Sequence, residues 1–201
     1  MLFSNKDLKK LIIPLVIEQF LLLLVGMVDV IMIAGVGEDA VSGVSLVDNI
    51  NILIINVFVA LATGGAVVSG HYLGQKDAKK ASKAGWQLVL FTSLLSLFVT
   101  FLFIFFHESL LSLIFGQVEP GVMNSAKTYL VVTALSIVPL AVYDSCAAIF
   151  RSFGDSKTTM WISVMMNVLH IILNAVFIFG MHMGVLVAAV STSISRLFAA
   201  I

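Results

Sequence analysis

The chain of 201 residues is 60% hydrophobic and only 11% charged, whereas about 25% of the residues of a soluble domain are charged. Its mean hydropathy is +1.12 and its formal net charge is zero. This composition predicts an integral membrane protein, and it offers no electrostatic basis for binding nucleic acid.

Six apolar runs follow one another along the chain, each close to the ~20 residues that an α-helix needs to cross a bilayer. Polar segments separate them; the longest are at 71–85 and 107–121, and the shortest is at 181–183. The sequence therefore predicts an all-α integral membrane protein, a six-helix transmembrane bundle. The expected spans are about 11–34, 46–70, 86–106, 127–150, 158–180 and 184–201.

Lysine and arginine are concentrated on one side of this predicted topology, which is typical of the cytoplasmic side. That side holds Lys6, Lys9, Lys10, Lys76, Lys79, Lys80, Lys83, Arg151 and Lys157. The other side holds only Lys127. We expect a multi-pass protein of the plasma membrane with a cytoplasmic N-terminus. Arg196 lies inside the last run, which ends at Ile201 without a polar flank, and this pattern suggests a chain truncated in or just after its sixth helix.

The first predicted helix contains two carboxylates, Glu18 and Asp29. An ionisable group at the bilayer centre costs roughly 2.5–3.5 kcal/mol, so each is a candidate functional residue. Their spacing of 11 residues corresponds to about three helical turns, which puts both on one face. Pro14 removes a backbone hydrogen bond and is expected to let this helix bend. The alternative is that Glu18 makes a packing contact and Asp29 caps the far end of the helix.

Other predicted helices carry polar residues on shared faces. Asn167, His170 and Asn174 form one stripe of the fifth helix, because they are three and four residues apart. Asn49 and Asn56 are seven residues apart on the second helix. Candidates for lining a cavity are Asn49, Asn56, Asn167 and Glu18. We expect Ser191 and Ser195 of the sixth helix to hold helices together.

Three further expectations concern charged or aromatic residues near helix ends. Asp48 is expected to cap the start of the second helix. Asp144 and Arg151 are seven residues apart on the fourth helix and are expected to form an ion pair. Tyr143 follows Pro139 by one turn and is a candidate for lining a cavity. The sequence does not identify a partner for Arg196.

The sequence suggests neither a cofactor nor an enzyme. It lacks a Walker A pattern, and no catalytic constellation is apparent. The residues suggest no metal site beyond a cation bound at Asp29.

Several segments resemble one family. They are IPLVIEQFLLLLVGMVDVIMIAGVG, GGAVVSGHYLGQKDAKKA, FRSFGDSKTTM and NVLHIILNAVFIFGMHMGVLVAAVSTSISR. In this order, and over essentially the whole chain, they resemble the multidrug and toxic compound extrusion (MATE) transporters. The resemblance implies a twelve-helix transporter of two similar lobes, of which this chain is the N-terminal lobe and from which the C-terminal lobe is missing.

The resemblance also implies an activity and a site. Such transporters export small organic compounds, often cationic, in exchange for H⁺ or Na⁺ by alternating access. Asp29 corresponds to an aspartate of the N-lobe cation site, Thr192 to its threonine, and the carbonyl of Ala188 lies one turn away. His170 and Asn174 stand where archaeal members have asparagine and aspartate. The imidazole makes proton coupling at least as plausible as sodium coupling, since histidine titrates near neutral pH.

The leading hypothesis is therefore the N-lobe of a cation-coupled drug antiporter in the lipid bilayer. One alternative is a flippase for a lipid-linked precursor, although the sequence offers few interior positive charges beyond Arg196. Another is a non-transporting membrane fragment or assembly protein.

Overall fold

The computed structural model describes residues 5–180 and 184–201, with the side chains of residues 5–7 and 179 excepted, and nearly all of these residues are helical. The helices are α1 (Asn5–Ala34), α2 (Glu38–Gly74), α3 (Ala78–Phe115), α4 (Pro120–Ala134), α5 (Ile137–Ser152), α6 (Ser156–Ala175), the π-helical turn Val176–Gly180, and α7 (Val185–Ala200). The polar segment predicted at 181–183 lies outside the described residues.

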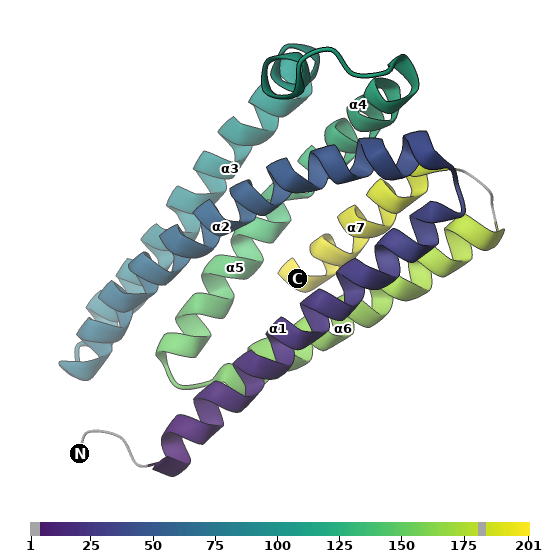
Figure 1. Cartoon of the computed structure of the whole chain (residues 1–201). Coiled ribbons are helices and arrows are strands. Elements are labelled where there is room, and N and C mark those ends of the chain that lie inside the picture. Colours follow the sequence, from purple (N-terminus) through teal and green to yellow (C-terminus); the bar gives the residue numbers. More distant parts are fainter. Residues whose placement is uncertain (1–4, 181–183) are drawn as a thin grey trace.

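The helices form two groups that α7 joins (Figure 1). α1 packs mainly along α6 on one flank, while α2, α3, α4 and α5 pack against one another on the other flank. α7 contacts α4, α5 and α6. The hydrophobic core lies mostly in the second group and includes the fully buried Val47, Leu130 and Ile137. Many large apolar side chains point outward, as expected for a surface that contacts lipid.

Each predicted span has a helical counterpart, but the helices differ in length. By length and composition, α1, α2, α3 and the segment Ser156–Ile178 can each cross a membrane. The pair α4 and α5 is bent by 50°, and α7 is a shorter apolar helix of 16 residues. Four described helices and the bent pair thus account for five of the six predicted spans by length, and α7 at the sixth is apolar but shorter. The predicted class, an all-α membrane bundle, agrees with the fold.

The helices extend well beyond the predicted apolar spans. Most of the polar segments expected at 71–85 and 107–121 are helical, because α2 continues to Gly74, α3 starts at Ala78, and α3 continues to Phe115. Helical hydrogen bonds do not require an apolar sequence, so a helix can continue into the polar edge of the membrane. Asp48 consequently lies inside α2, which begins ten residues earlier at Glu38, and its expected role as the N-cap is wrong.

The fourth predicted span is not one continuous helix, and this too is a correction. α4 ends at Ala134 and α5 begins at Ile137. Local hydroxyls bond carbonyl groups near the break: Ser136 donates to the Thr133 carbonyl at 2.6 Å. Pro139 lacks an N–H group, and at the third position of α5 this group would have no partner within the helix.

Candidate functional site

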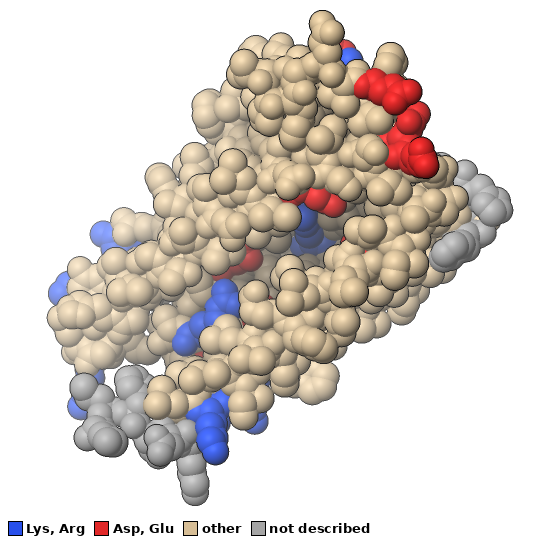
Figure 2. Space-filling view, in the orientation of Figure 1, with Lys and Arg blue, Asp and Glu red and all other residues tan. Residues whose placement is uncertain are grey.

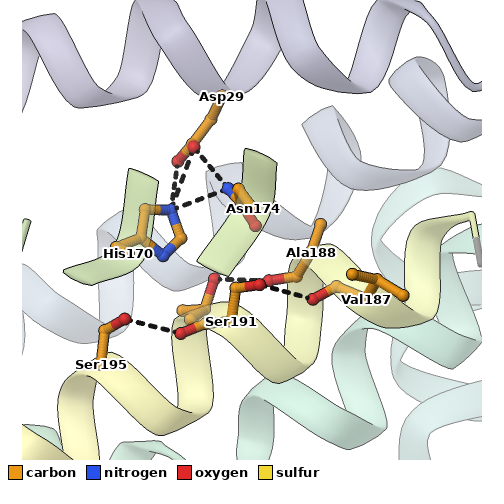
Figure 3. A network of polar contacts seen from close by, with 8 residues as sticks. Asp29, His170, Asn174, Val187, Ala188, Ser191 and Ser195 are labelled. Atoms are coloured by element: carbon orange, nitrogen blue, oxygen red, sulfur yellow. Dashed lines mark hydrogen bonds and ion pairs between the residues drawn. The ribbon is translucent and has the colours of Figure 1, made fainter. Parts of the chain in front are cut away.

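The centre of the candidate site is a polar cluster between α1 and α6 (Figure 3). Asp29 projects from α1 toward His170 and Asn174, which are one turn apart on α6. Nε2 of His170 lies 2.8 Å from Oδ2 and 3.0 Å from Oδ1 of Asp29. Nδ2 of Asn174 donates to Oδ1 of Asp29 at 2.7 Å. His170 and Asn174 are buried, whereas the Asp29 side chain is 27% exposed.

The distance between Asp29 and His170 has a chemical consequence. A nitrogen and an oxygen 2.8 Å apart form a hydrogen bond only when one of them carries the shared proton. Either the Nε2–H group of the imidazole donates to the carboxylate, or a protonated Asp29 donates to Nε2. Nδ2 of Asn174 also lies 3.1 Å from Nε2, but in the second case the one lone pair of Nε2 already accepts from Asp29, so Nδ2 donates to Oδ1 of Asp29. The contact between Asp29 and His170 thus needs one shared proton, which either side chain can carry.

The helix that carries His170 and Asn174 has a capped start and a buried polar stripe. Asp155 is the N-cap of α6: its Oδ1 accepts from the N–H group of Thr158 at 3.1 Å, and its Oδ2 accepts from the Thr158 hydroxyl at 2.6 Å. The bonds from Thr158 lower the pKa of Asp155 below its ordinary value of 3.8. Further along, Asn167 is buried and donates to the hydroxyl of Ser163 at 3.3 Å. The polar stripe predicted for this helix thus faces the interior.

The hydroxyl groups of α7 form a separate series of contacts (Figure 3). Thr192 donates to the carbonyl of Ala188 at 2.9 Å. Ser191 and Ser195 each donate to the carbonyl four residues earlier in α7. Among the described residues, no hydrogen bond joins this series to Asp29. Of the five residues predicted to couple ions, the structure brings Asp29, His170 and Asn174 into contact, and it pairs Thr192 with Ala188 on the neighbouring helix.

Glu18 belongs to a second polar contact, which links α1 to α5. Its Oε1 accepts from the Tyr143 hydroxyl at 3.4 Å, and its Oε2 accepts from Nη1 of Arg151 at 3.5 Å. Arg151 therefore pairs with Glu18 and not with Asp144, so the expected ion pair within the fourth span is wrong. The geometric reason is that Arg151 points across the bundle toward α1 rather than along its own helix. Asp144 is buried, and Oδ2 of its side chain has no hydrogen-bond partner among the described residues.

The remaining predicted residues occupy different environments. Pro14 is buried and lies within a continuous α1. Asn49 and Asn56 are exposed on α2, and Nδ2 of Asn49 donates to the Ser45 carbonyl at 2.7 Å. Figure 2 shows a hollow between α1 and α2 in which both basic and acidic side chains are visible, on a face that is otherwise largely uncharged.

The structure also reveals two contacts that the sequence did not indicate. Nη1 of Arg196 donates to the Ser136 hydroxyl at 2.8 Å, so the arginine of α7 binds at the break between α4 and α5. Ser193 of α7 donates to the carbonyl of Val132 in α4 at 3.2 Å. Ser136 lies three residues before Pro139, and only the fold brings it to α7. Within the described part of the chain, no three His, Cys, Asp or Glu side chains form a metal-binding group.

The fold and the site define a class: a helical membrane bundle whose interior carries buried, hydrogen-bonded ionisable groups. Comparison with known proteins gives the family. Residues 14–176 match the MatE family model, and the chain belongs to this family.

Two relatives and one solved structure illustrate the match. An uncharacterised transporter, YisQ of Bacillus subtilis, is 32% identical over 188 residues, which are 91% of this chain and 41% of the relative. A probable multidrug resistance protein NorM of Thermotoga maritima is 30% identical over 199 residues, covering 96% of this chain and 42% of that protein. An outward-facing multidrug resistance MATE family transporter superimposes with a TM-score of 0.90 at 22% identity, over 97% of this chain and 43% of that structure. The chain thus spans about two fifths of the length of these proteins and has the fold of one lobe.

Proposed function

We propose that this chain is the N-terminal lobe of a secondary active antiporter. The complete transporter would export organic, often cationic, compounds in exchange for H⁺ or Na⁺ by alternating access. Its partners would be the C-terminal lobe of the same transporter and the surrounding bilayer. We further propose that it lies in the plasma membrane with a cytoplasmic N-terminus, because most lysines and arginines fall on one side of the helices.

The observation that carries the proposal is the contact of Asp29 with His170 and Asn174. A carboxylate in an apolar helix is costly, and it persists where it binds a partner or an ion. Here it joins α1 to α6, two helices that pack along each other. Gain or loss of a positive charge at Asp29 would change this contact and, through it, the position of α1. The buried Pro14 would let the cytoplasmic part of the same helix bend.

The contacts of Asp29 favour coupling to protons over coupling to sodium ions. Both neighbours present nitrogen atoms to the Asp29 carboxylate, and the imidazole can exchange a proton with it directly. A hard cation such as sodium prefers several oxygen ligands, and the cluster contains one carboxylate. One observation supports sodium coupling as the second candidate: Oδ1 of Asn174 is buried and accepts no hydrogen bond from the described residues, so it is an oxygen that a cation could use.

The polar face of α2 supports a central cavity between two lobes. Asn49 and Asn56 are exposed although they lie within a membrane-spanning helix. Exposed amides are unfavourable against hydrocarbon, so this face would line a water-filled passage or contact the second lobe. A cavity of this kind would take an organic cation.

The test is transport by the intact protein in proteoliposomes, with proton and sodium gradients applied separately. The Asp29→Asn variant should insert normally and lose gradient-driven export of a fluorescent organic cation, because an amide cannot take up a proton. Asp39→Asn is the matched control, since Asp39 is an exposed carboxylate in the first turn of α2. Normal export by Asp29→Asn would overturn the proposal. Export that a sodium gradient drives and a proton gradient does not would identify sodium as the coupling ion instead of the proton.

A further inference from the structure

A groove lies at the end of the bundle where the lysines gather. It is formed by the last turns of α2, the first turns of α3 and the end of α5, with a volume of about 400 Å³. Small side chains of α3, namely Ala81, Ser82 and Gly85, form one wall. Ile149 of α5 and Trp86 complete it. Most of the lining is apolar, which suits contact with a hydrocarbon chain.

Lysines follow the lining residues of this groove closely along α3. Lys79, Ser82 and Trp86 are three and four residues apart on α3, so they lie on one side of the helix. Lys80 forms an ion pair with Asp77 at 2.9 Å. Lys79 and Lys83 are exposed, and neither forms an ion pair with a described carboxylate. The mouth of the groove therefore carries excess positive charge.

The distances along α3 match the layers of a membrane. Lys79 precedes Trp86 by seven residues, or roughly 10 Å of helix at 1.5 Å per residue. The headgroup layer of a bilayer leaflet is about 5–8 Å thick. Trp86 is 68% exposed, and tryptophan prefers the boundary between hydrocarbon and headgroups. With Trp86 at this boundary, the lysines and the upper lining of the groove reach the level of lipid phosphates, while its lower lining, which includes Val89 and Ile149, reaches the level of the acyl chains.

We propose that this groove is a binding site for an anionic phospholipid. One acyl chain lies along Gly85, Val89 and Ile149, the glycerol backbone lies near Ser82, and the phosphate contacts Lys79 and Lys83. The charge at the mouth selects an anionic headgroup over a zwitterionic one, since each lysine near an anionic lipid surface contributes a favourable electrostatic interaction. Occupation of the site would hold the ends of α2, α3 and α5 together.

Native mass spectrometry of the full-length transporter in detergent tests the proposal, with titration of dioleoyl phosphatidylglycerol or dioleoyl phosphatidylcholine. Phosphatidylglycerol should bind more tightly. Lys79→Gln and Lys83→Gln should each weaken its binding about fivefold. Lys157→Gln is the matched control, because it removes an exposed lysine from the same predicted side of the membrane but outside the groove. Equal binding of the two lipids, or an equal loss in Lys157→Gln, would overturn the proposal.

A second pair of variants tests the groove itself. Ser82→Phe fills it and should weaken binding of phosphatidylglycerol, whereas Gln87→Phe adds the same bulk to an exposed position of α3 outside the groove and should not. If both variants bind like the wild type, no acyl chain occupies the groove and the proposal is wrong. These measurements do not involve transport, so their outcome is independent of the antiporter proposal.

Discussion

At the scale of single residues, the buried carboxylate of Glu18 is the clearest case of a side chain that depends on its neighbours. It is 7% exposed, and its two oxygens each accept one long hydrogen bond, from Tyr143 and Arg151. A buried acceptor that loses its donor keeps the cost of leaving water. Loss of a donor would therefore destabilise the protein mainly because it leaves a buried carboxylate oxygen without a hydrogen bond, and less because the bond itself is strong.

This argument predicts the effect of Arg151→Gln. The change leaves Glu18 buried with only Tyr143 beside it, and it should destabilise the bundle by about 1–3 kcal/mol. Glu18→Gln should cost less, because the remaining arginine is partly exposed and can reach water. Thermal unfolding in detergent can be followed by reaction of Cys146, the single cysteine of the chain, with a thiol-reactive dye.

Lys127→Gln provides the comparison. Lys127 and Glu108 form a shorter ion pair, at 2.7 Å, but their side chains are 31% and 68% exposed. Exposed pairs contribute about 0–1 kcal/mol. If Lys127→Gln lowers stability as much as Arg151→Gln does, burial of Glu18 is not the cause of the effect.

Sequence reasoning identified Asp29, His170 and Asn174 but paired other residues wrongly, and the reason is physical. Residues on one face of one helix follow from the helical period, so the stripe on α6 was predictable. Contacts between helices depend on how each helix is rotated and how deep it lies, and Arg151 therefore paired with Glu18 of α1 instead of Asp144 of its own helix. For the same reason, Ser136 could not be predicted as the partner of Arg196.

At the scale of helices, α2 and α4 approach each other closely at a glycine. A Cβ atom added to Gly43 would lie 2.8 Å from the Val122 carbonyl oxygen and 2.8 Å from the Ala126 nitrogen. Both atoms belong to the backbone of α4, which cannot move aside as a flexible side chain can. Close approach of helices through small residues is a common basis of packing within membranes.

Gly43→Ala should therefore destabilise the bundle, by about 1–3 kcal/mol as in other overpacked cores. Gly64→Ala in the same helix should do the opposite, with a gain of up to about 1 kcal/mol, because alanine favours helix and a Cβ atom there meets no atom within 4 Å. Unfolding midpoints of the two variants in the same detergent provide the measurement. If both variants lose stability, α2 is sensitive to alanine at either glycine, and the close approach of α2 and α4 at Gly43 does not explain the effect of Gly43→Ala.

The helices themselves were largely predictable, since each apolar run became a helix. Hydropathy carries this information because any segment in hydrocarbon must satisfy its own backbone groups. It carries little information on where a helix ends at the membrane surface, so α2 and α3 proved longer than expected. Nor does it reveal the break after Ala134, which local side-chain hydroxyls and Pro139 accommodate within a run that stays apolar.

At the scale of the whole molecule, charge and helix order together define the topology. Four lysines lie in or just after the turn from α2 to α3, between residues 76 and 83, whereas residues 116–119 between α3 and α4 contain no lysine or arginine. A difference of this kind between successive loops determines which side faces the cytoplasm.

Labelling of introduced cysteines in cells checks this orientation. In a Cys146→Ser background, Gln117→Cys should react with a membrane-impermeant maleimide in intact cells. Gln75→Cys, which is also exposed, should react only after permeabilisation. The reverse pattern would place the N-terminus outside and would exclude the proposed direction of export.

The position of α1 has a mechanical consequence. Polar side chains of α1 contact neighbouring helices at two positions: Asp29 contacts α6, and Glu18 contacts α5. The two positions are 11 residues apart, or about 16 Å along the helix at 1.5 Å per residue. Because the two contacts belong to different neighbours, a cation that neutralises one leaves the other intact. Glu18 lies near the middle of α1, so a helix that loses only its contact at Asp29 would pivot about that middle contact instead of sliding along its axis.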